Sequence, residues 1–315
     1  MTPRPLDLLD LPTLYRYRSE AVSLDSTRVL TRGNPLGAAG FMSYFNPARH
    51  LYTAVSQENG ETLLGGVIQT NGDAFARLVY IAPASRLTHP ALPGLIEHLA
   101  AEAGRWGAFH VLAEIEENSQ AFPALRMAGF SVYAWQRIWD VSNITPPQGA
   151  ATPAEGEALW TRVQSVNLPA VQSLYHQIVP PLLQPVEPTP KRPAGLFTTE
   201  GVRCYVHLTY GMHGIVLTPL IHPDAVDVEL KLASLFNELP ERRGRPVYLC
   251  VRSYQAWLEP VLEDLGGMAA PRQAVMVKHL AHLVKDDQAL RAAQPAGVGA
   301  LREPSRVSHV EVNEK

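Results

Sequence analysis

The chain has 315 residues, a length that fits two domains of ordinary size. Hydrophobic residues make up 46% of it, which excludes a disordered chain, and a net charge of -3 without a cluster of Lys and Arg argues against a nucleic-acid-binding face. Its two cysteines exclude a disulfide framework and a Cys-rich metal site, so we expect a protein of the reducing cytoplasm.

The spacing of apolar and turn residues predicts the elements of the first half in chain order. They are a helix that begins after Asp10, strands over residues 51–55, 62–70 and 75–81, a helix over 92–103, a strand over 109–115, a helix over 119–127 and a strand over 131–141. Asn-Gly pairs separate the three early strands, which predicts an antiparallel meander. The helix over 92–103, between the strands over 75–81 and 109–115, implies a parallel crossover.

The second half follows a similar order, which indicates an internal duplication. Its predicted elements are a helix that begins after Asn167, strands over 202–209 and 214–221, a helix over 228–236, a strand over 246–251, a helix over 254–265 and a strand over 273–280. The run Ile221-His-Pro223 closes the second set of strands as Ile81-Ala-Pro83 closes the first.

Proline is frequent, at 27 residues, and two proline-rich stretches divide the chain. The first, residues 144–153, has no large apolar side chain after Ile144 and is predicted to be an interdomain linker. The second, residues 180–193, retains apolar residues such as Val186, and we expect an extended segment that lies over its own domain. The predicted divisions are a first domain over 1–143, a second over 154–285 and a flexible tail over 286–315.

This order of elements resembles the GCN5-related N-acetyltransferase (GNAT) superfamily. The most specific parts are Ile81-Ala-Pro83 and the run from Asn118 to Gly129-Phe130, which is similar to the family's Asn-x-x-Ala and Gly-Phe signature. The resemblance covers residues 1–141 and, more weakly, 155–283. It implies an α/β (α+β) fold with two tandem GNAT-like domains, each a mixed, mostly antiparallel sheet flanked by helices.

The resemblance also implies acetyl-CoA as the acyl donor. In the family the fourth and fifth strands splay apart, the pantetheine arm fills the notch between them, and the pyrophosphate lies on backbone amides of the loop before the next helix. Free amides and the positive end of a helix attract phosphate. By resemblance the first half would bind the cofactor through Tyr80, Ile81, Arg86, Leu87, Thr88, His89, Ala91 and Asn118.

The first half departs from the family pattern where the chemistry would need it. Arg86 and Ala91 fit the phosphate loop, but His89 replaces a glycine and Pro90 lacks an amide donor. The loss of one charge-assisted hydrogen bond costs about 1.5–3 kcal/mol, which weakens binding without abolishing it. Leu125 stands where many members carry a Tyr that protonates the CoA sulfur.

The second half departs further. Its corresponding loop holds three acids, which repel a pyrophosphate, and Leu262 stands at the Tyr position. If either half binds CoA we therefore expect it to be the first. The second half would complete a pseudo-dimer, either by packing against the first half or by shaping an acceptor cleft.

Glu114 and Glu116 are candidate catalytic bases because, with His110, they share one face of a predicted strand. Acyl transfer requires a neutral amine, and either carboxylate could remove its proton; a solvated strand end is the alternative. Two further residues have alternative roles. Tyr80 either contacts the pantetheine or packs, and Asn118 either binds the cofactor or caps the next helix.

We expect an acyl-CoA-dependent N-acyltransferase, with acetyl as the acyl group, in which an amine of a small molecule or peptide attacks the thioester directly. The alternative is a catalytically inactive GNAT-fold pseudoenzyme that serves as a ligand-binding or protein-interaction module. A third possibility is an unrelated α/β protein with the same order of elements. We expect no metal ion, nucleic acid or membrane, and a cytoplasmic protein that is a monomeric pseudo-dimer or a homodimer.

Overall fold

The computed structural model describes residues 2–37, 49–58, 60–70, 72–144, 159–198, 202–237 and 239–280. Most of the predicted linker and the whole predicted tail lie outside these ranges. Residues 1–280 group into one compact unit by their contacts. We call the described residues up to 144 the first half and those from 159 onward the second half.

The first half contains the meander, crossover helix and final strand that the sequence predicts. Its strands are β1 (Arg4–Pro5), β2 (Val22–Ser23), β3 (Arg49–Glu58), β4 (Glu61–Thr70), β5 (Phe75–Ala82), β6 (His110–Glu116) and β7 (Ser131–Asp140). Its helices are α1 (Leu11–Arg16), α2 (Ser26–Arg32), α4 (Leu92–Arg105) and α5 (Ala121–Met127), with 3-10 turns at η1 (Leu8–Asp10), η2 (Arg18–Glu20) and η4 (Ala84–Arg86). Gly60 follows β3 and Gly72 follows β4, and their φ values of 78° and 85° lie in the left-handed region that favours glycine.

The second half repeats this order with shorter strands. They are β8 (Trp160–Arg162), β9 (Gly195–Thr198), β10 (Cys204–Tyr210), β11 (Ile215–Ile221), β12 (Val247–Arg252), β13 (Met268–Ala269) and β14 (Gln273–His279). The helices are α6 (Leu168–Ile178), α7 (Val228–Asn237) and α8 (Leu258–Asp264), with 3-10 turns at η5 (Ser165–Asn167) and η6 (Ser253–Gln255). The expected fold class, tandem mixed sheets flanked by helices, is confirmed.

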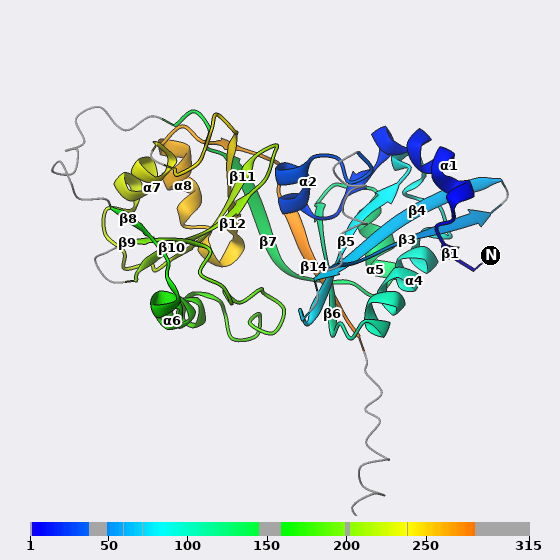
Figure 1. The fold of residues 1–315 in the computed structure, drawn as a ribbon, viewed down its shortest axis with the longest axis horizontal. Coiled ribbons are helices and arrows are strands. Elements are labelled where there is room, and N and C mark those ends of the chain that lie inside the picture. The colour runs from blue at the N-terminus through cyan, green and yellow to red at the C-terminus, as the bar shows by residue number, and fades with distance from the viewer. Residues whose placement is uncertain are drawn as a thin grey trace, which may run out of the picture. The chain divides into compact units, whose positions relative to one another are not determined.

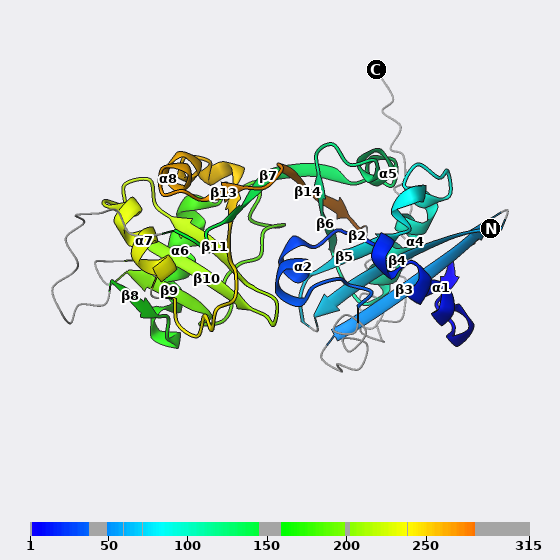
Figure 2. The ribbon, with the colours of Figure 1, turned by 90° about the horizontal axis from the view of Figure 1, so that it is seen from above.

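Helices cover both faces of each half's strands (Figure 2). In the first half, α4 and α5 bury Leu95, Ile96 and Leu125 in one core cluster, whereas Leu14 of α1 belongs to a cluster on the other face. In α4 the buried residues recur at helical spacing, and Pro93 lies in its first turn, where a missing N–H costs nothing.

The two halves exchange their last strands. The sheet order is β1-β3-β4-β5-β6-β14-β7-β12-β11-β10-β9-β8, so β14 lies between two strands of the first half (Figure 1). In return, the distal part of β7 pairs with β12 on one edge and with β13 on the other. Each half is therefore completed by a strand from the other half.

The exchanged strands carry core residues with them. Met276 of β14 is fully buried in the main core cluster of the first half, and Trp139 of β7 is buried in that of the second half. Burial of apolar area is the main stabilising contribution to a core. The stability of each half therefore depends on the sequence of the other.

We predict that Met276→Ala lowers the free energy of unfolding by about 2–5 kcal/mol, because it leaves a cavity in the first half's core. Chemical denaturation should show one transition, since both halves share strands. The matched control is Met127→Ala, which changes a 67% exposed methionine and should shift stability by no more than about 0.5 kcal/mol. Separate unfolding transitions for the two halves would contradict this prediction.

Candidate functional site

β5 and β6, which correspond to the family's fourth and fifth strands, splay apart, as the family resemblance implies. β5 and β6 pair in parallel only from Phe75 opposite His110 to Arg77 opposite Leu112, and beyond these residues they separate. Directly after this point β5 carries a bulge: Leu78 lies opposite Val67 and Tyr80 opposite Gly66, which leaves Val79 extra. We call the gap beyond Arg77 and Leu112 the first notch.

The second half has a notch of the same kind. β11 and β12 pair from Ile215 opposite Val247 to Leu217 opposite Leu249 and then separate. Counting from the last paired residues of β6 and β12, Gln255 stands at the position that Asn118 holds in the first half. The two notches can therefore be compared residue by residue.

A segment of the chain itself lies in the first notch. β2 pairs with the free edge of β5, with Val22 opposite Ile81 and Ser23 opposite Tyr80. Leu24 then joins both edges: its N–H donates to the carbonyl of Val79 at 2.9 Å, and its carbonyl accepts from the N–H of Glu114 at 2.8 Å. We call residues 22–24 the notch segment.

Tyr80 and Ile81, two of the predicted cofactor contacts, are 2% and 1% exposed. The Tyr80 hydroxyl lies 2.9 Å from Thr53 Oγ1. Its ring also lies against Gly66, where an added Cβ would come within 2.4 Å of the ring. The Tyr80 side chain is therefore packed in the interior, and its contact with the pantetheine stays a prediction, which would involve the backbone edge that β2 covers.

The backbone amides of the predicted phosphate loop are largely used within the loop. The His89 N–H donates to the Arg86 carbonyl at 3.1 Å, and the Leu92 N–H donates to the His89 carbonyl at 3.0 Å. The Ala91 N–H donates to Nδ1 of His89 at 3.1 Å. The side chain that replaces the family's glycine thus takes up an amide that the family offers to phosphate.

A carboxylate of the chain contacts two side chains of this loop. Glu61 Oε1 lies 3.7 Å from Arg86 Nη2, and its Oε2 lies 3.2 Å from His89 Nε2. The other two predicted loop contacts differ from each other, since Leu87 is buried in the core and Thr88 is exposed. The loop retains a positive character, but Glu61 already neutralises part of it.

Glu114 is buried, with 4% of its surface exposed, and lies among positive groups. Its carboxylate is 3.5 Å from Arg77 Nη1 and 3.8 Å from Arg252 Nη2, and it accepts from the Ser26 N–H at 3.0 Å. Burial alone would raise the pKa of Glu114, but Arg252, Arg77 and the hydrogen bonds hold it below its ordinary value. Burial raises the pKa of the neighbouring Asp25, and the charge of Glu114 adds to that effect.

The remaining candidates of the first half lie on the surface. Glu116 and Asn118 are both exposed where β6 ends, and Ser119 supplies the side-chain hydrogen bond to the start of α5, from the Ala121 N–H at 3.3 Å. Leu125, at the family's Tyr position, is fully buried. Glu114 and Glu116 therefore occupy different environments although they lie on one face of β6.

The second proline-rich stretch differs from its prediction. Val186 packs against Leu112 and Val277, so the segment covers strands of the first half's sheet and not only its own half. The adjacent Glu187 contacts the buried Arg252, with Oε1 2.9 Å from Nε. Sequence reasoning missed this charged cluster, because Arg77, Glu187 and Arg252 belong to distant segments without a shared motif.

A side chain fills the second notch. Gln255 is 1% exposed, and its Oε1 accepts from the Ile221 N–H at 2.9 Å. Its Nε2 donates to the Pro219 carbonyl at 2.8 Å. The residue at the Asn118 position thus binds two backbone groups of β11 beyond its last pair with β12 and closes this notch.

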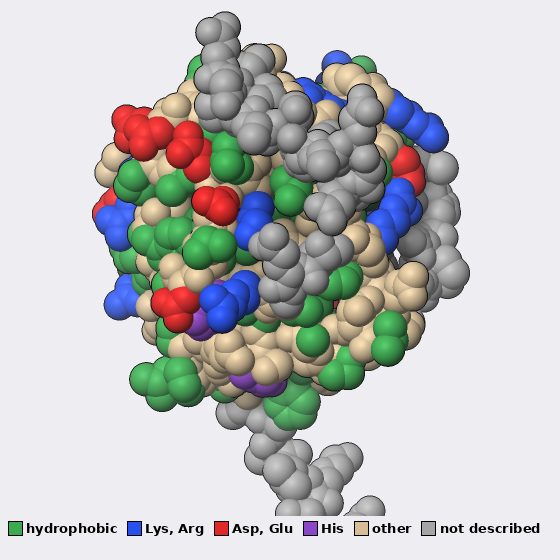
Figure 3. Space-filling model, turned by 90° about the vertical axis from the view of Figure 1, so that its left-hand side faces the viewer, with side chains coloured by type: hydrophobic (Ala, Val, Ile, Leu, Met, Phe, Trp, Pro, Cys, Tyr) green, Lys and Arg blue, Asp and Glu red, His purple; other side chains and the backbone are tan. Residues whose placement is uncertain are grey.

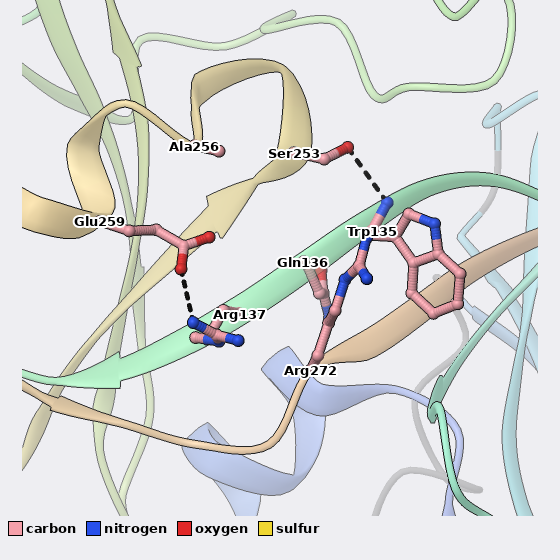
Figure 4. A pocket seen from close by; sticks show the side chains of 7 residues that line it. All are labelled: Trp135, Gln136, Arg137, Ser253, Ala256, Glu259 and Arg272. Carbon is pink, nitrogen blue, oxygen red and sulfur yellow. Dashed lines mark hydrogen bonds and ion pairs between the residues drawn. The ribbon is translucent and has the colours of Figure 1, made fainter.

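A separate cavity of about 250 Å³ lies where β7 passes η6 and α8 (Figure 4). Its polar groups are mostly paired with each other, and its lining residues are Trp135, Gln136, Arg137, Ser253, Ala256, Glu259 and Arg272. Arg137 contacts Glu259 at 2.7 Å, and the Arg272 guanidinium lies 4.2 Å from the centre of the Trp135 ring. This cavity is distinct from both notches.

The other features of the described residues assign no further site. Positive and negative side chains lie interspersed on the face drawn in Figure 3. None of the helices in the described part of the chain combines the length and the apolar character that a bilayer crossing requires. The described residues contain no group of three or more His, Cys, Asp or Glu side chains arranged to hold a metal ion.

Comparison with known proteins identifies the fold. No family model and no curated protein matches the chain. A GCN5-related N-acetyltransferase from Sphaerobacter thermophilus superposes with a TM-score of 0.53 at 16% identity, covering 88% of this chain and 95% of that one. A tandem GNAT protein from the clavulanic acid biosynthesis pathway superposes with a TM-score of 0.52 at 14% identity, covering 88% and 98%.

The chain has a tandem GNAT fold. Both similar structures cover nearly their whole length, so the likeness extends over the two halves and not over one unit alone. This confirms the fold that the resemblance implied, while identities this low carry no information on substrate.

We predict that Gln255→Ala lowers the free energy of unfolding by about 2 kcal/mol or more, because it leaves the Ile221 N–H and the Pro219 carbonyl buried without this partner. Amide exchange should become faster at Ile221. Gln177→Ala, which changes an exposed glutamine on α6, serves as the control and should leave both measurements unchanged. Unchanged exchange at Ile221 in Gln255→Ala would show that the side chain does not close the notch.

We predict that Glu114→Gln lowers the free energy of unfolding by about 3–5 kcal/mol at neutral pH, since Arg77 and Arg252 lose a buried counter-charge. Because the pKa of Glu114 is lowered on folding, its contribution is present above its ordinary value of 4.5 and is lost as the pH falls through the lowered value. Stability measured against pH should therefore show the two proteins converging in acid. The control is the exposed Glu116→Gln, and parallel curves for Glu114→Gln and wild type would refute the assignment.

Proposed function

We propose that the protein is an acyl-CoA-dependent N-acyltransferase with its site in the first half, acetyl-CoA as the donor and an amine as the acceptor. The observation that carries the proposal is the first notch, where the bulge at Val79 and the separation of β5 from β6 leave two strand edges facing each other. Such edges offer alternating N–H and carbonyl groups to a linear ligand that contains amides. The tandem GNAT fold supports the same reaction class.

The first half is the better candidate because the backbone of a short segment occupies its notch, whereas the buried Gln255 side chain closes the second notch. The loop after Pro223 adds to this difference, since the exposed Asp224 follows at once and repels a diphosphate. In the first half, Arg86 and His89 would exchange the Glu61 carboxylate for the diphosphate. That exchange involves only partly exposed groups, which are easily separated.

In the proposed reaction the amine nitrogen forms a bond to the thioester carbonyl carbon and gives up one proton to water, the carbon–sulfur bond breaks, and the leaving thiolate takes a proton from water. Asn118 is exposed beside the notch and would hydrogen-bond the cofactor. Glu116 would remove the ammonium proton of the acceptor, because solvent reaches it at the end of β6. Glu114 would position the site, since its buried carboxylate is held in the charged state by two arginines.

A second candidate is the non-catalytic GNAT-fold module that binds a ligand or a protein. The notch segment, the use of loop amides by His89 and the contact of Glu61 with the loop all favour it, because each occupies a position where the resemblance places a part of acyl-CoA. The two candidates differ in one measurable property, the binding of acyl-CoA.

Titration with acetyl-CoA and CoA by calorimetry tests the proposal. We expect binding that Arg86→Glu weakens about tenfold to a hundredfold through loss of a charge-assisted contact. Arg105→Glu is the matched control, since it reverses a 68% exposed arginine on the same half away from the loop. Release of CoA thiol in the presence of amines then reports turnover, and the buried Cys204 and Cys250 limit the background. If neither the wild type nor a variant with a weakened notch segment gives heat at millimolar ligand, the acyltransferase proposal is wrong and the non-catalytic module is favoured.

A further inference from the structure

We propose that the notch segment, Val22–Leu24, competes with acyl-CoA for the first notch, so that the cofactor binds only after the segment withdraws. The inference rests on the proposed function. It adds a regulatory contact, since the chain supplies its own occupant for the site. Three features of the segment carry it: the strand edges it pairs with, the side chain it buries and the way its two ends are held.

The segment uses the backbone groups that line the notch on both sides. Val22 and Ser23 pair with β5 beyond the bulge, and Leu24 bonds to β5 through its N–H and to β6 through its carbonyl. A backbone donor or acceptor that is already paired cannot bind a second amide at full strength. A ligand whose amides lie along β5 therefore excludes the segment, and the segment excludes the ligand.

The segment also fills the space of the notch. The Leu24 side chain is 2% exposed and belongs to the same core cluster as Ile81, Leu92 and Ile115. Protein interiors are packed to the density of organic crystals, so an acyl arm cannot enter beside this side chain. Entry of an acyl arm requires Leu24 to leave.

The two ends of the segment are held differently. On its C-terminal side, the Asp25 carboxylate caps α2 by accepting from the Arg28 N–H at 3.0 Å, and Glu114 accepts from the Ser26 N–H at 3.0 Å. On its N-terminal side the turn η2 is held by exposed contacts, such as Ser85 Oγ with Glu20 at 3.1 Å. We therefore place the moving end at Val22 and the fixed end at Asp25.

Competition of this kind has a quantitative consequence. The apparent dissociation constant for acyl-CoA equals the intrinsic constant divided by the fraction of molecules with the segment withdrawn. A change that weakens the closed form raises that fraction and strengthens binding. A change that locks the closed form abolishes binding.

The first test weakens the closed form. Leu24→Ala removes the buried side chain, and we expect it to bind acetyl-CoA at least tenfold more tightly than wild type in calorimetry. The control is Leu99→Ala, which truncates a leucine of the same core cluster on α4 and should bind as wild type does. Thermal unfolding of both variants verifies that each is folded at the titration temperature.

The second test locks the closed form with a disulfide. Leu24 and Val79 are a hydrogen-bonded pair, so Ser23 and Tyr80 form the adjacent non-hydrogen-bonded pair, whose side chains are closest. We expect the double variant Ser23→Cys with Tyr80→Cys to bind acetyl-CoA when reduced and to lose at least tenfold in affinity when oxidised. Because both forms carry the same substitutions, the loss of the Tyr80 ring does not enter the comparison.

Amide exchange provides a readout that is independent of affinity. In wild type, saturating acetyl-CoA should make exchange at Leu24 faster, because its N–H loses the Val79 carbonyl. Equal affinity of Leu24→Ala, Leu99→Ala and wild type, together with equal affinity of the oxidised and reduced double variant, would overturn the competition and leave the proposed function intact. Absence of binding in every form, including Leu24→Ala and the reduced double variant, would overturn the proposed function itself.

Discussion

The pairing of β14 with both β6 and β7 is the constraint on which the rest of the structure depends. β14 holds one edge of β6, while β5 separates from the other edge of β6. In the second half, β7 holds one edge of β12 in the same way, while β11 separates from the other edge. A strand held on one side only can keep its position while its neighbour diverges. The two notches exist because the exchanged strands hold β6 and β12 in place.

Each notch exposes backbone groups in the protein interior, and such groups must find partners. The second half satisfies β11 with one carboxamide, that of Gln255, whereas the first half uses the backbone of a separate segment. The Gln255 side chain, on the turn that directly follows β12, is a permanent partner for β11. A two-residue strand joined to a surface turn is a replaceable one, and this difference gives the duplicated halves unequal roles.

The sequence predicted the order of the long elements well, because strands such as β4 and β5 and helix α4 carry clear apolar periods and glycine turns. It did not predict β2, since two residues show no period, nor the role of Gln255, since a local pattern does not show which backbone groups a glutamine side chain will bond. The strand exchange was also missed. Residues 131–141 read as one final strand, and nothing in a local pattern tells which half such a strand completes. Which strands pair depends on residues far apart in the sequence, and a local pattern of apolar residues does not include them.

The exchange of strands bears on synthesis at the ribosome. A protein chain emerges from its N-terminus, and domains ordinarily fold as they emerge. Here the strand that completes the first half is β14, more than a hundred residues after β7, so β6 and β7 stay unpaired with it until the chain has been made as far as His279. Open strand edges attract other chains. The nascent first half would therefore depend on chaperones, or on rapid elongation, for longer than a single acetyltransferase-like unit that carries its own last strand.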